Sequence, residues 1–394
     1  MYFFSTTVAA ISFTFVFLLE LATHSLANGT TNTTHRPRPQ RQLSVDYYSK
    51  TCPQVDQLVA SVTSQQFKEA PISGPATIRL FFHDCFVEPL VVVTIISYLA
   101  TCPRAREMIT TLIRHSPKLT PEPGKESGIL CMNNGCDGSI LISTKQGSKE
   151  LAERDADDNK ELAVEAFDSI NKAKMLVESK CPGVVSCADI LAIAARDFIH
   201  LAKGPYYQVK KGRWDGKISM ATRVSPNLPR ANSTLDDLIQ LFKSKGLTLE
   251  DLVTLSGAHT IGFAHCKNFL ARLYNYKNTM KPDPSIELRL LEALTMLCPR
   301  FGGNTDIVAP CDVTTPFLFD NAYYGNLESQ LGVLASDQVL FLDPRTKPLV
   351  QALAKDKEKF FQDFAVAMDK MGSIGVKRGR RHGEKRIDCS MNEH

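Results

Sequence analysis

The run Arg79-Leu-Phe-Phe-His-Asp-Cys-Phe86 brings an arginine, a histidine and aromatic residues together at helical spacing. Arg79 and His83 are four residues apart, so on a helix they project from one face, with Phe82 beside them. A histidine base next to a fixed cation can move a proton between the two oxygens of a bound peroxide and stabilise the charge that develops as the O–O bond breaks. The same pair also fits a surface arginine beside a helix-capping histidine, and its residues alone leave both interpretations open.

A second histidine, His259, lies in the apolar run Leu252-Val-Thr-Leu-Ser-Gly-Ala-His-Thr-Ile-Gly262. An imidazole in an apolar helix, preceded by small residues that let a flat group approach closely, meets the needs of an axial haem ligand. A lone buried histidine is more often structural. Asp337 favours the ligand interpretation, because its carboxylate can accept the other ring N–H and make the imidazole a stronger donor to iron.

Helical periodicity predicts the elements that must carry these groups. Three segments have an apolar face, and a further amphipathic segment spans Phe360 to Met371. The three faces consist of Val55, Leu58, Val59 and Val62; of Ile190, Leu191, Ala194 and Ala195; and of Leu235, Leu238, Ile239 and Phe242. Thr234-Leu-Asp-Asp237 is typical of a capping box variant that opens the third helix. Strand signals are few and short, so we predict an all-α fold.

Composition excludes several classes of protein. The 394 residues are 43% hydrophobic and 22% charged, which excludes a wholly disordered chain. A net charge of +4 is too balanced for a protein whose main partner is nucleic acid. Eleven cysteines are many for a cytosolic enzyme and suit an exported one.

The first residues predict export. Phe3 to Leu19 form an almost uncharged apolar run, and Ser25-Leu-Ala27 offers the small residues of a signal-peptidase site. We predict a signal peptide over 1–27, a mobile arm over 28–42 and a secreted glycoprotein. The run is close to the shortest bilayer-spanning length, so an uncleaved membrane anchor is the alternative. The sequons that begin at Asn28, Asn32 and Asn232 fit N-glycosylation in that compartment.

Five motifs, in one order along the chain, resemble those of the class III plant secretory haem peroxidases. They are Arg79–Phe86, Asn134-Gly-Cys-Asp-Gly-Ser139, Val185-Ser-Cys-Ala-Asp189, Leu255-Ser-Gly-Ala-His-Thr260 and Phe319-Asp-Asn-Ala-Tyr-Tyr324. The resemblance covers Leu43 to about Cys389 apart from one stretch. It implies a two-lobed, all-α haem peroxidase domain over 43–394, with the haem between distal and proximal helices. It also implies an extracellular or cell-wall enzyme that uses hydrogen peroxide to oxidise small phenolic donors in one-electron steps.

The resemblance further assigns roles to individual residues. Arg79, Phe82 and His83 would form the distal pocket, in which Asn159 accepts from the His83 ring and Glu153 holds Asn159. His259 would ligate the iron of one haem b, with Asp337 as its carboxylate partner. Pro229 would present its carbonyl near the exposed haem edge, where donors dock.

Two calcium ions and four disulfides are also implied by the resemblance. The distal ion would take Asp84, the Val87 carbonyl, the Gly135 carbonyl, Asp137 and Ser139; the proximal ion Thr260, Asp312, Thr315, the Leu318 carbonyl and Asp320. The bridges would be Cys52–Cys181, Cys85–Cys136, Cys187–Cys389 and Cys266–Cys298. Scattered Asp and Thr residues also cap loops, but their position beside both histidines favours metal.

One stretch departs from the family. In the family, the segment Phe-His-Asp-Cys-Phe-Val is followed directly by Gly-Cys-Asp. In this chain about 46 residues, 89–134, are inserted between them, in the distal calcium loop. Pro89 to Ala100 is apolar and β-branched, unlike the motif on either side. We interpret the segment as a translated retained intron or a gene-model error. If it displaces His83, deleting it should raise the peroxide rate by orders of magnitude; if it loops out, closure costs only about a few kcal/mol.

Other functions remain as alternatives. The insertion favours a haem-fold wall protein or an unproductive isoform with impaired activity. A zinc module built from His83, Cys85, Cys102, His115, Cys131 and Cys136 would need reduced thiols, which an exported chain does not keep. The three cysteines without a family partner are Cys102, Cys131 and Cys311, and we expect Cys311 to be buried and inert.

A basic cluster late in the chain bears on partners. It consists of Lys377, Arg378, Arg380, Arg381, Lys385 and Arg386. We predict that it attaches the protein to acidic wall polysaccharide in a salt-dependent way, with a solvated loop as the alternative. We expect a monomer with no nucleic-acid partner and no stable membrane insertion once the signal peptide is removed.

Overall fold

The computed structural model describes residues 42–87, 135–304 and 306–391, and these residues are mainly helical. The α-helices are α2 (Val55–Glu69), α3 (Ser73–Phe86), α6 (Val164–Lys180), α7 (Cys187–Leu201), α8 (Leu235–Ser244), α9 (Leu249–Ser256), α10 (Leu270–Tyr274), α11 (Leu288–Leu297), α12 (Ala322–Glu328), α13 (Ala335–Leu342), α14 (Lys347–Lys355) and α15 (Lys357–Met371). The 3₁₀ turns are η2 (Ser139–Leu141), η3 (Glu153–Asp155), η4 (Ala221–Arg223), η5 (Ser225–Asn227), η6 (Gly257–Thr260), η7 (Cys266–Asn268) and η8 (Tyr276–Asn278). The short strands β1 (Phe263–His265) and β2 (Val308–Pro310) pair antiparallel. The predicted all-α class with few short strands is confirmed.

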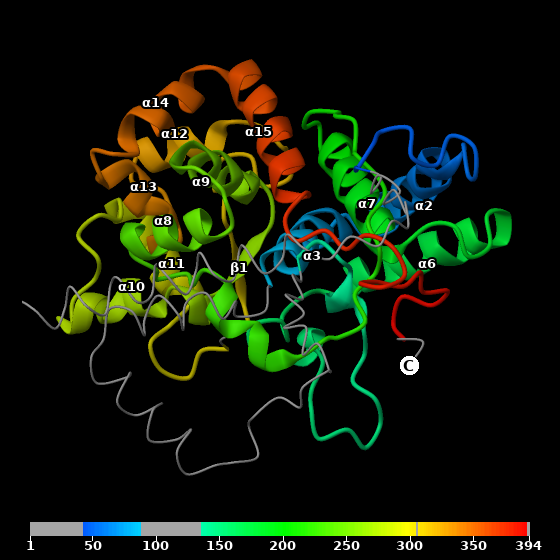
Figure 1. The fold of residues 1–394 in the computed structure, drawn as a ribbon. Helices are drawn as coiled ribbons and strands as arrows, with labels where there is room; N and C mark the ends of the chain where they lie inside the picture. The colour runs from blue at the N-terminus through cyan, green and yellow to red at the C-terminus, as the bar shows by residue number, and fades with distance from the viewer. Residues whose placement is uncertain (1–41, 88–134, 305, 392–394) are drawn as a thin grey trace, which may run out of the picture. The chain divides into compact units, whose positions relative to one another are not determined.

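A first group of helices surrounds α3, which carries the Arg79–Phe86 motif. Helices α6 and α7 both pack against α3, and α2 packs against α6 and α7 (Figure 1). In α7 every residue from Cys187 to Ile199 is buried, which includes the whole predicted apolar face. On α2, Val55 and Val59 are buried as predicted. Because α7 is enclosed in this way by apolar neighbours, it supports α3 in a fixed position.

A second group contains α8, α9 and α12 to α15. Helix α9 packs against α8, α14 and α15, and α12 packs against α13 and α14. The predicted capping box is present: Thr234 and Asp237 exchange side-chain and backbone hydrogen bonds at the start of α8. Thr248 and Asp251 form a second box, which we did not predict, at the start of α9. Such caps stabilise a helix by about 1 kcal/mol, and the second one fixes the helix that leads into His259.

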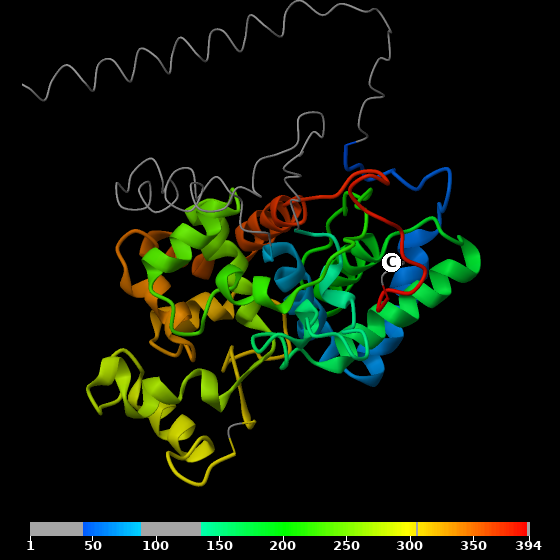
Figure 2. The same ribbon diagram turned by 60° about the horizontal axis from the view of Figure 1, so that its bottom comes forward.

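A smaller core lies around α10, α11 and the two strands. Phe269, Leu273, Leu290 and Leu294 are among its buried residues. Figure 2 shows this yellow-green region away from the blue and green helices of the first group. The Cys266–Cys298 disulfide joins the start of η7 to the end of α11 within it.

The described residues contain four disulfides, and they are the four pairs that the family resemblance implied. They are Cys52–Cys181, Cys85–Cys136, Cys187–Cys389 and Cys266–Cys298. Cys311 is a buried free thiol, as expected. Because Cys85 and Cys136 are bridged, the zinc interpretation that needs both as ligands is wrong.

Some predictions fall outside the described residues. The signal peptide over 1–27, almost all of the arm over 28–42 and the inserted residues 89–134 lie there, with Cys102 and Cys131. Within the described ranges, none of the helices has the length and apolar character that crossing a membrane requires.

The basic cluster near the chain end is not the uniformly exposed patch that its sequence indicated. Arg378, Arg380 and Arg381 are exposed. Lys377 and Arg386 are buried, at 7% and 0% exposure. Lys377 and Arg386 are buried because they contact internal carboxylate and carbonyl groups. With the half-buried Lys385, half of the expected patch is therefore wholly or partly covered by the protein.

Candidate active site

The first cluster of candidate residues lies on α3. Arg79 is exposed, Phe82 is half-buried and His83 is buried, and the Arg79 Nε donates to the His83 Nε2 at 3.3 Å. The helical spacing of the sequence thus brings the base and the cation together as predicted. The Phe82 and Phe86 rings lie 4.1 Å apart and form an apolar wall beside them.

The orientation of the His83 ring is fixed by a side-chain amide. His83 Nδ1 lies 2.6 Å from the Asn159 Oδ1, and because that oxygen can only accept, Nδ1 carries the proton and Nε2 keeps its lone pair. The Asn159 Nδ2 donates to the backbone carbonyl of Glu153 at 2.7 Å. Glu153 therefore meets Asn159 through its main chain, whereas the resemblance left open which part of it did so.

The His83 imidazole remains neutral over a wide pH range. Burial is the main reason, the Arg79 charge adds to it, and together they lower the pKa of His83 to about 3 despite the Asn159 hydrogen bond. A neutral imidazole whose Nε2 carries no proton, and here accepts from the Arg79 Nε, can act as a proton acceptor, which is what general base catalysis requires.

Three buried carboxyl groups lie directly behind His83, and we call Asp84, Asp137 and Glu153 the distal carboxylate cluster. Asp84 accepts from the Gly138 and Ile140 amides, and the Ser139 hydroxyl donates to Glu153 at 2.9 Å. Two oxygens, Asp137 Oδ2 and Glu153 Oε1, are buried without a hydrogen bond. Burial, with mutual repulsion between the carboxylates, raises the pKa of Asp84 and of Glu153. Buried acidic oxygens that lack a hydrogen bond fit a hard cation.

Gly135 and Val87 flank the segment that lies outside the described residues, and both are buried in this region. The Gly135 carbonyl accepts from the Asp137 amide at 2.6 Å, and the next residue, Cys136, donates to the Ile374 carbonyl at 3.1 Å. A side chain at position 135 would collide with the Ile374 carbonyl, so glycine is required there. Hydrogen bonds therefore hold Asp84, Gly135, Asp137 and Ser139 in one region of the fold, and Val87 lies two residues after Cys85, which is bridged to Cys136.

The second histidine belongs to a different element from the one predicted. Helix α9 ends at Ser256, and His259 lies in the 3₁₀ turn η6. Gly257 has to be small for packing as well, because a side chain there would meet Tyr324 and Phe360 of the core. The tighter turn carries His259 away from the axis of α9 and toward Asp337 on α13.

Asp337 holds the His259 ring from behind. Its two carboxylate oxygens lie 2.9 and 3.1 Å from His259 Nδ1, and the aspartate is buried. The His259 side chain is 43% exposed, so its Nε2 is available. Burial alone would lower the pKa of His259, but the charge and hydrogen bond of Asp337 more than offset it and the pKa is raised. The Tyr323 ring meets the imidazole edge-on at 6.2 Å.

A second group of oxygens converges beside His259. The Thr260 hydroxyl lies 3.1 Å from Asp312 and 3.5 Å from both the Leu318 carbonyl and Asp320. The Thr315 hydroxyl lies 3.3 Å from Asp312 and 3.1 Å from Asp320. All five predicted proximal ligands therefore surround one point, with two carboxylates among them, as a calcium site requires.

Ion pairs that we did not predict lie at the edge between the two histidine clusters, and we call this edge the rim. Glu161, two residues after Asn159, pairs with Lys267 of η7, and Asp158 lies 3.4 Å from Arg230. The Arg79 Nη1 donates to the Glu161 carbonyl at 3.4 Å. The charge of Arg79 opposes, but does not reverse, the rise that Asp337 causes in the pKa of His259.

Pro229 lies on this rim next to Arg230. It is half-buried, and the following Ala231 carbonyl accepts from the Ser336 amide at 3.0 Å. The predicted donor-docking residue is thereby connected to α13, which bears Asp337.

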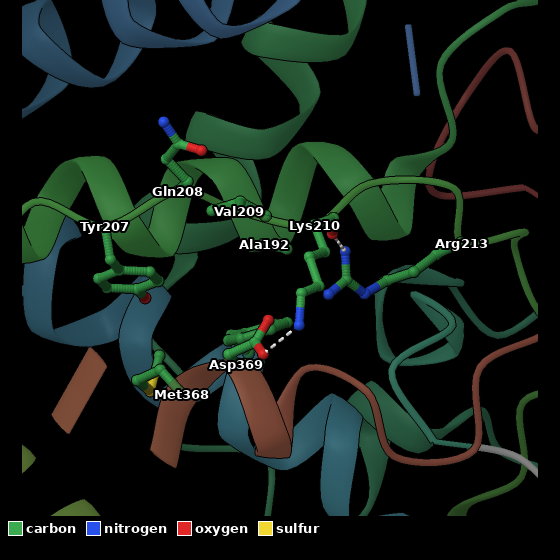
Figure 3. A pocket seen from close by; sticks show the side chains of 9 residues that line it. Ala192, Tyr207, Gln208, Val209, Lys210, Arg213, Met368 and Asp369 are labelled. Carbon is green, nitrogen blue, oxygen red and sulfur yellow. Dashed lines mark hydrogen bonds and ion pairs between the residues drawn. The ribbon is translucent and has the colours of Figure 1, made fainter. Parts of the chain in front are cut away.

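A separate hollow lies between α7 and α15. Lys210 and Asp369 form a 2.6 Å ion pair across it, and Arg213 donates to the Lys210 carbonyl (Figure 3). Its free volume is about 10 Å³, the space of a single water molecule, so it is no substrate site.

Some residues of the site carried little sequence signal. Tyr323 lies in the Phe319–Tyr324 motif, which could have indicated it. Glu161 and Lys267 belong to no motif, and Lys377 was singled out only as part of the basic cluster; the fold alone brings these residues to the site.

Comparisons with known proteins agree with this geometry. The family model described as "Peroxidase" matches residues 59–356. The chain is 59% identical over 379 residues to "Peroxidase 19" of Arabidopsis thaliana, with 96% of each chain covered. It is 41% identical to "Peroxidase 41" and to "Peroxidase 55" of the same plant, over 89% of this chain and 91% and 90% of theirs.

The pH dependence of the peroxide step tests the low pKa of His83. Because burial and Arg79 keep the imidazole neutral, the rate measured by stopped flow should stay constant from about pH 8 down to about pH 4. Arg79→Leu should lower the rate and move the acid limb to higher pH, since a cation that lowers the His83 pKa is removed. A wild-type acid limb near pH 6.5 would contradict the assignment.

Proposed function

The chain belongs to the class III plant peroxidase family and is a haem peroxidase, and on that premise we propose that its two histidine clusters are the distal and proximal sides of one haem site. The observation that carries the proposal is the His259–Asp337 pair, which fixes one ring nitrogen and leaves the other exposed. The substrates of the family are hydrogen peroxide and a reducing donor.

His259 would hold the iron of one haem b through Nε2. An axial histidine bonded to a carboxylate is a stronger donor, and Asp337 is already within hydrogen-bond distance of Nδ1. When bound, the haem supplies the redox chemistry that accepts oxidising equivalents from peroxide and passes them to donors one electron at a time.

His83 and Arg79 would handle the peroxide. The unprotonated Nε2 of His83, which accepts from Arg79 in this structure, would take the proton from one peroxide oxygen and return it to the other, which leaves as water. The Arg79 guanidinium stabilises the negative charge on the departing oxygen. Phe82 forms an apolar wall that limits the water around the reacting oxygens, and Asn159 keeps the base in the required tautomer.

Small phenols would dock at the rim near Pro229. Its carbonyl is a hydrogen-bond acceptor for a phenolic O–H, and Arg230 and Asp158 border the same place. Charged residues at this entrance favour small, polar aromatic donors over large apolar ones.

Two calcium ions would occupy the two oxygen clusters. The distal ion would take oxygens of Asp84, Val87, Gly135, Asp137 and Ser139; the proximal ion oxygens of Thr260, Asp312, Thr315, Leu318 and Asp320. Support comes from the buried, unbonded Asp137 Oδ2 and Glu153 Oε1 on one side and from the convergence of five oxygens on the other. Each ion would brace a histidine, because Asp84 follows His83 and Thr260 follows His259.

We further propose that residues 89–134 are an insertion in a peroxidase domain over 43–394. The Cα atoms of Cys85 and Cys136 are 4.0 Å apart, and His83 and Asn159 are in contact. These distances support an active enzyme, and the unproductive alternative is not favoured. A retained intron or gene-model error remains our hypothesis for the origin of the segment, and transcript reads across positions 87–135 test it.

Members of the class are secreted, and we propose that this chain reaches the extracellular space or cell wall as a monomer after loss of residues 1–27. The exposed Arg378, Arg380 and Arg381 would bind acidic polysaccharide weakly. Elution from pectin at rising salt concentration tests that attachment, and elution that ignores salt would contradict it.

Replacing His259 with Ala should abolish haem retention or leave a weakly held haem, because its imidazole is the proposed iron ligand. The Soret absorbance of the purified protein measures this. His200→Ala, at the end of α7, is the control and should retain haem. An unchanged Soret band with full turnover in His259→Ala would overturn the proposal.

Replacing Asp337 with Asn should keep the haem but raise the reduction potential of the iron, since a neutral amide no longer strengthens His259. A loss of activity of about 10–100-fold should accompany it. Asp343→Asn, at the end of the same helix, should retain the wild-type potential. Spectroelectrochemical titration measures both, and an unaltered potential in Asp337→Asn would count against the pair.

Deleting 89–134, so that Glu88 joins Gly135, should leave the peroxide rate within about threefold of the full chain. The sequence alone led us to expect a large gain if His83 were displaced, but its contact with Asn159 is already made. Stopped-flow rates of both proteins measure this, and a gain of about a hundredfold would mean that the segment misplaces the base.

A further inference from the structure

The distal carboxylate cluster places several acidic groups in a buried region where hydrogen bonds meet only part of their charge. Asp84, Asp137 and Glu153 are exposed by only 1%, 0% and 0%. Asp137 Oδ2 and Glu153 Oε1 have no hydrogen bond, so part of the negative charge is not met by a donor. A nearby cation stabilises three carboxylates that are buried together, because buried charge is costly unless it is paired.

A lysine from the far end of the chain lies beside this cluster. The Lys377 Nζ is 3.9 Å from Asp137 Oδ2, and the side chains are 8% and 0% exposed. The Lys377 backbone carbonyl accepts from the Trp214 amide at 3.2 Å, which fixes the segment after α15 at this place. Lysine is almost never buried without a charged neighbour, and here the neighbour is a proposed metal ligand.

The position of the ammonium differs from that of a bound metal ion. Calcium contacts its oxygens at about 2.3–2.6 Å, whereas Nζ is 3.9 Å from Asp137 Oδ2. The ammonium therefore leaves the first coordination position on that oxygen free. It nevertheless places a positive charge close to where a divalent ion would bind, in a buried region where charges interact strongly.

We infer that Lys377 is a resident counter-cation of the distal carboxylate cluster, which weakens calcium binding there and holds the cluster together when calcium is absent. The inference rests on the distal calcium site proposed above. It gives the distal and proximal sites different affinities, since no lysine is paired with Asp312 or Asp320 among the ion pairs of the described residues.

The test is calcium binding by the holoenzyme carrying Lys377→Met, which keeps the length of the side chain and removes its charge. Calcium is removed with a chelator and restored in an isothermal titration with calcium chloride alone. The Kd of the weaker site should fall by about tenfold or more in Lys377→Met, because a like charge no longer opposes the ion. Chelation should also lower the melting temperature more in this variant than in the wild type.

Two controls separate charge from general damage. Arg378→Met removes a neighbouring but exposed cation and should behave as the wild type. Lys377→Arg retains the charge and should keep weak binding. If Lys377→Met does not fold, Lys377→Gln takes its place with the same expectation. Wild-type affinity and an unchanged chelation effect in the neutral variants would overturn the inference.

Calcium stoichiometry distinguishes this inference from the proposal beneath it. At saturating calcium, elemental analysis should find two ions per chain in the wild type and in the variants. Two ions with equal affinities in Lys377→Met and the wild type would overturn only the role of Lys377. One ion or none in every protein would overturn the distal calcium site itself, and the inference with it.

Discussion

The hydrogen bond between His83 and Asn159 is the interaction on which the distal chemistry depends, because it decides which imidazole nitrogen can accept a proton. At 2.6 Å it is short, and the asparagine is itself held by the Glu153 carbonyl. Glu153 is held in turn by Ser139 and Ser219. The tautomer of one ring thus depends on a chain of contacts that ends in the distal carboxylate cluster.

On the proximal side, too, a hydrogen bond fixes the histidine ring and the next residue belongs to an oxygen cluster. Asp337 fixes the ring of His259, and the next residue, Thr260, belongs to a buried oxygen cluster with Asp312. Each histidine is therefore attached by one peptide bond to a residue that a calcium ion would immobilise. If calcium binds as proposed, we expect its loss from either cluster to alter the position of an imidazole as well as stability.

Much of this site could be predicted from local sequence, and the failures have physical causes. The pairing of Arg79 with His83 follows from helical period, and the Thr234–Asp237 cap follows from local hydrogen bonding. The placement of His259 in a 3₁₀ turn depends on the packing of Gly257 against Tyr324 and Phe360, which no local pattern contains. The sequence placed Lys377 in a basic cluster that we expected to bind polysaccharide, because its burial against Asp137 results from contacts about 240 positions apart in the chain.

The Cys85–Cys136 bridge, with Cα atoms 4.0 Å apart, closes a covalent ring that contains the whole of residues 89–134. A protease that cuts anywhere inside this ring would leave both new ends attached to the same folded body. The nicked protein would keep its full mass on a non-reducing gel and separate into two fragments only after reduction. The same ring is a natural place to graft a foreign peptide, because the two attachment points are fixed by a disulfide rather than by the peptide itself.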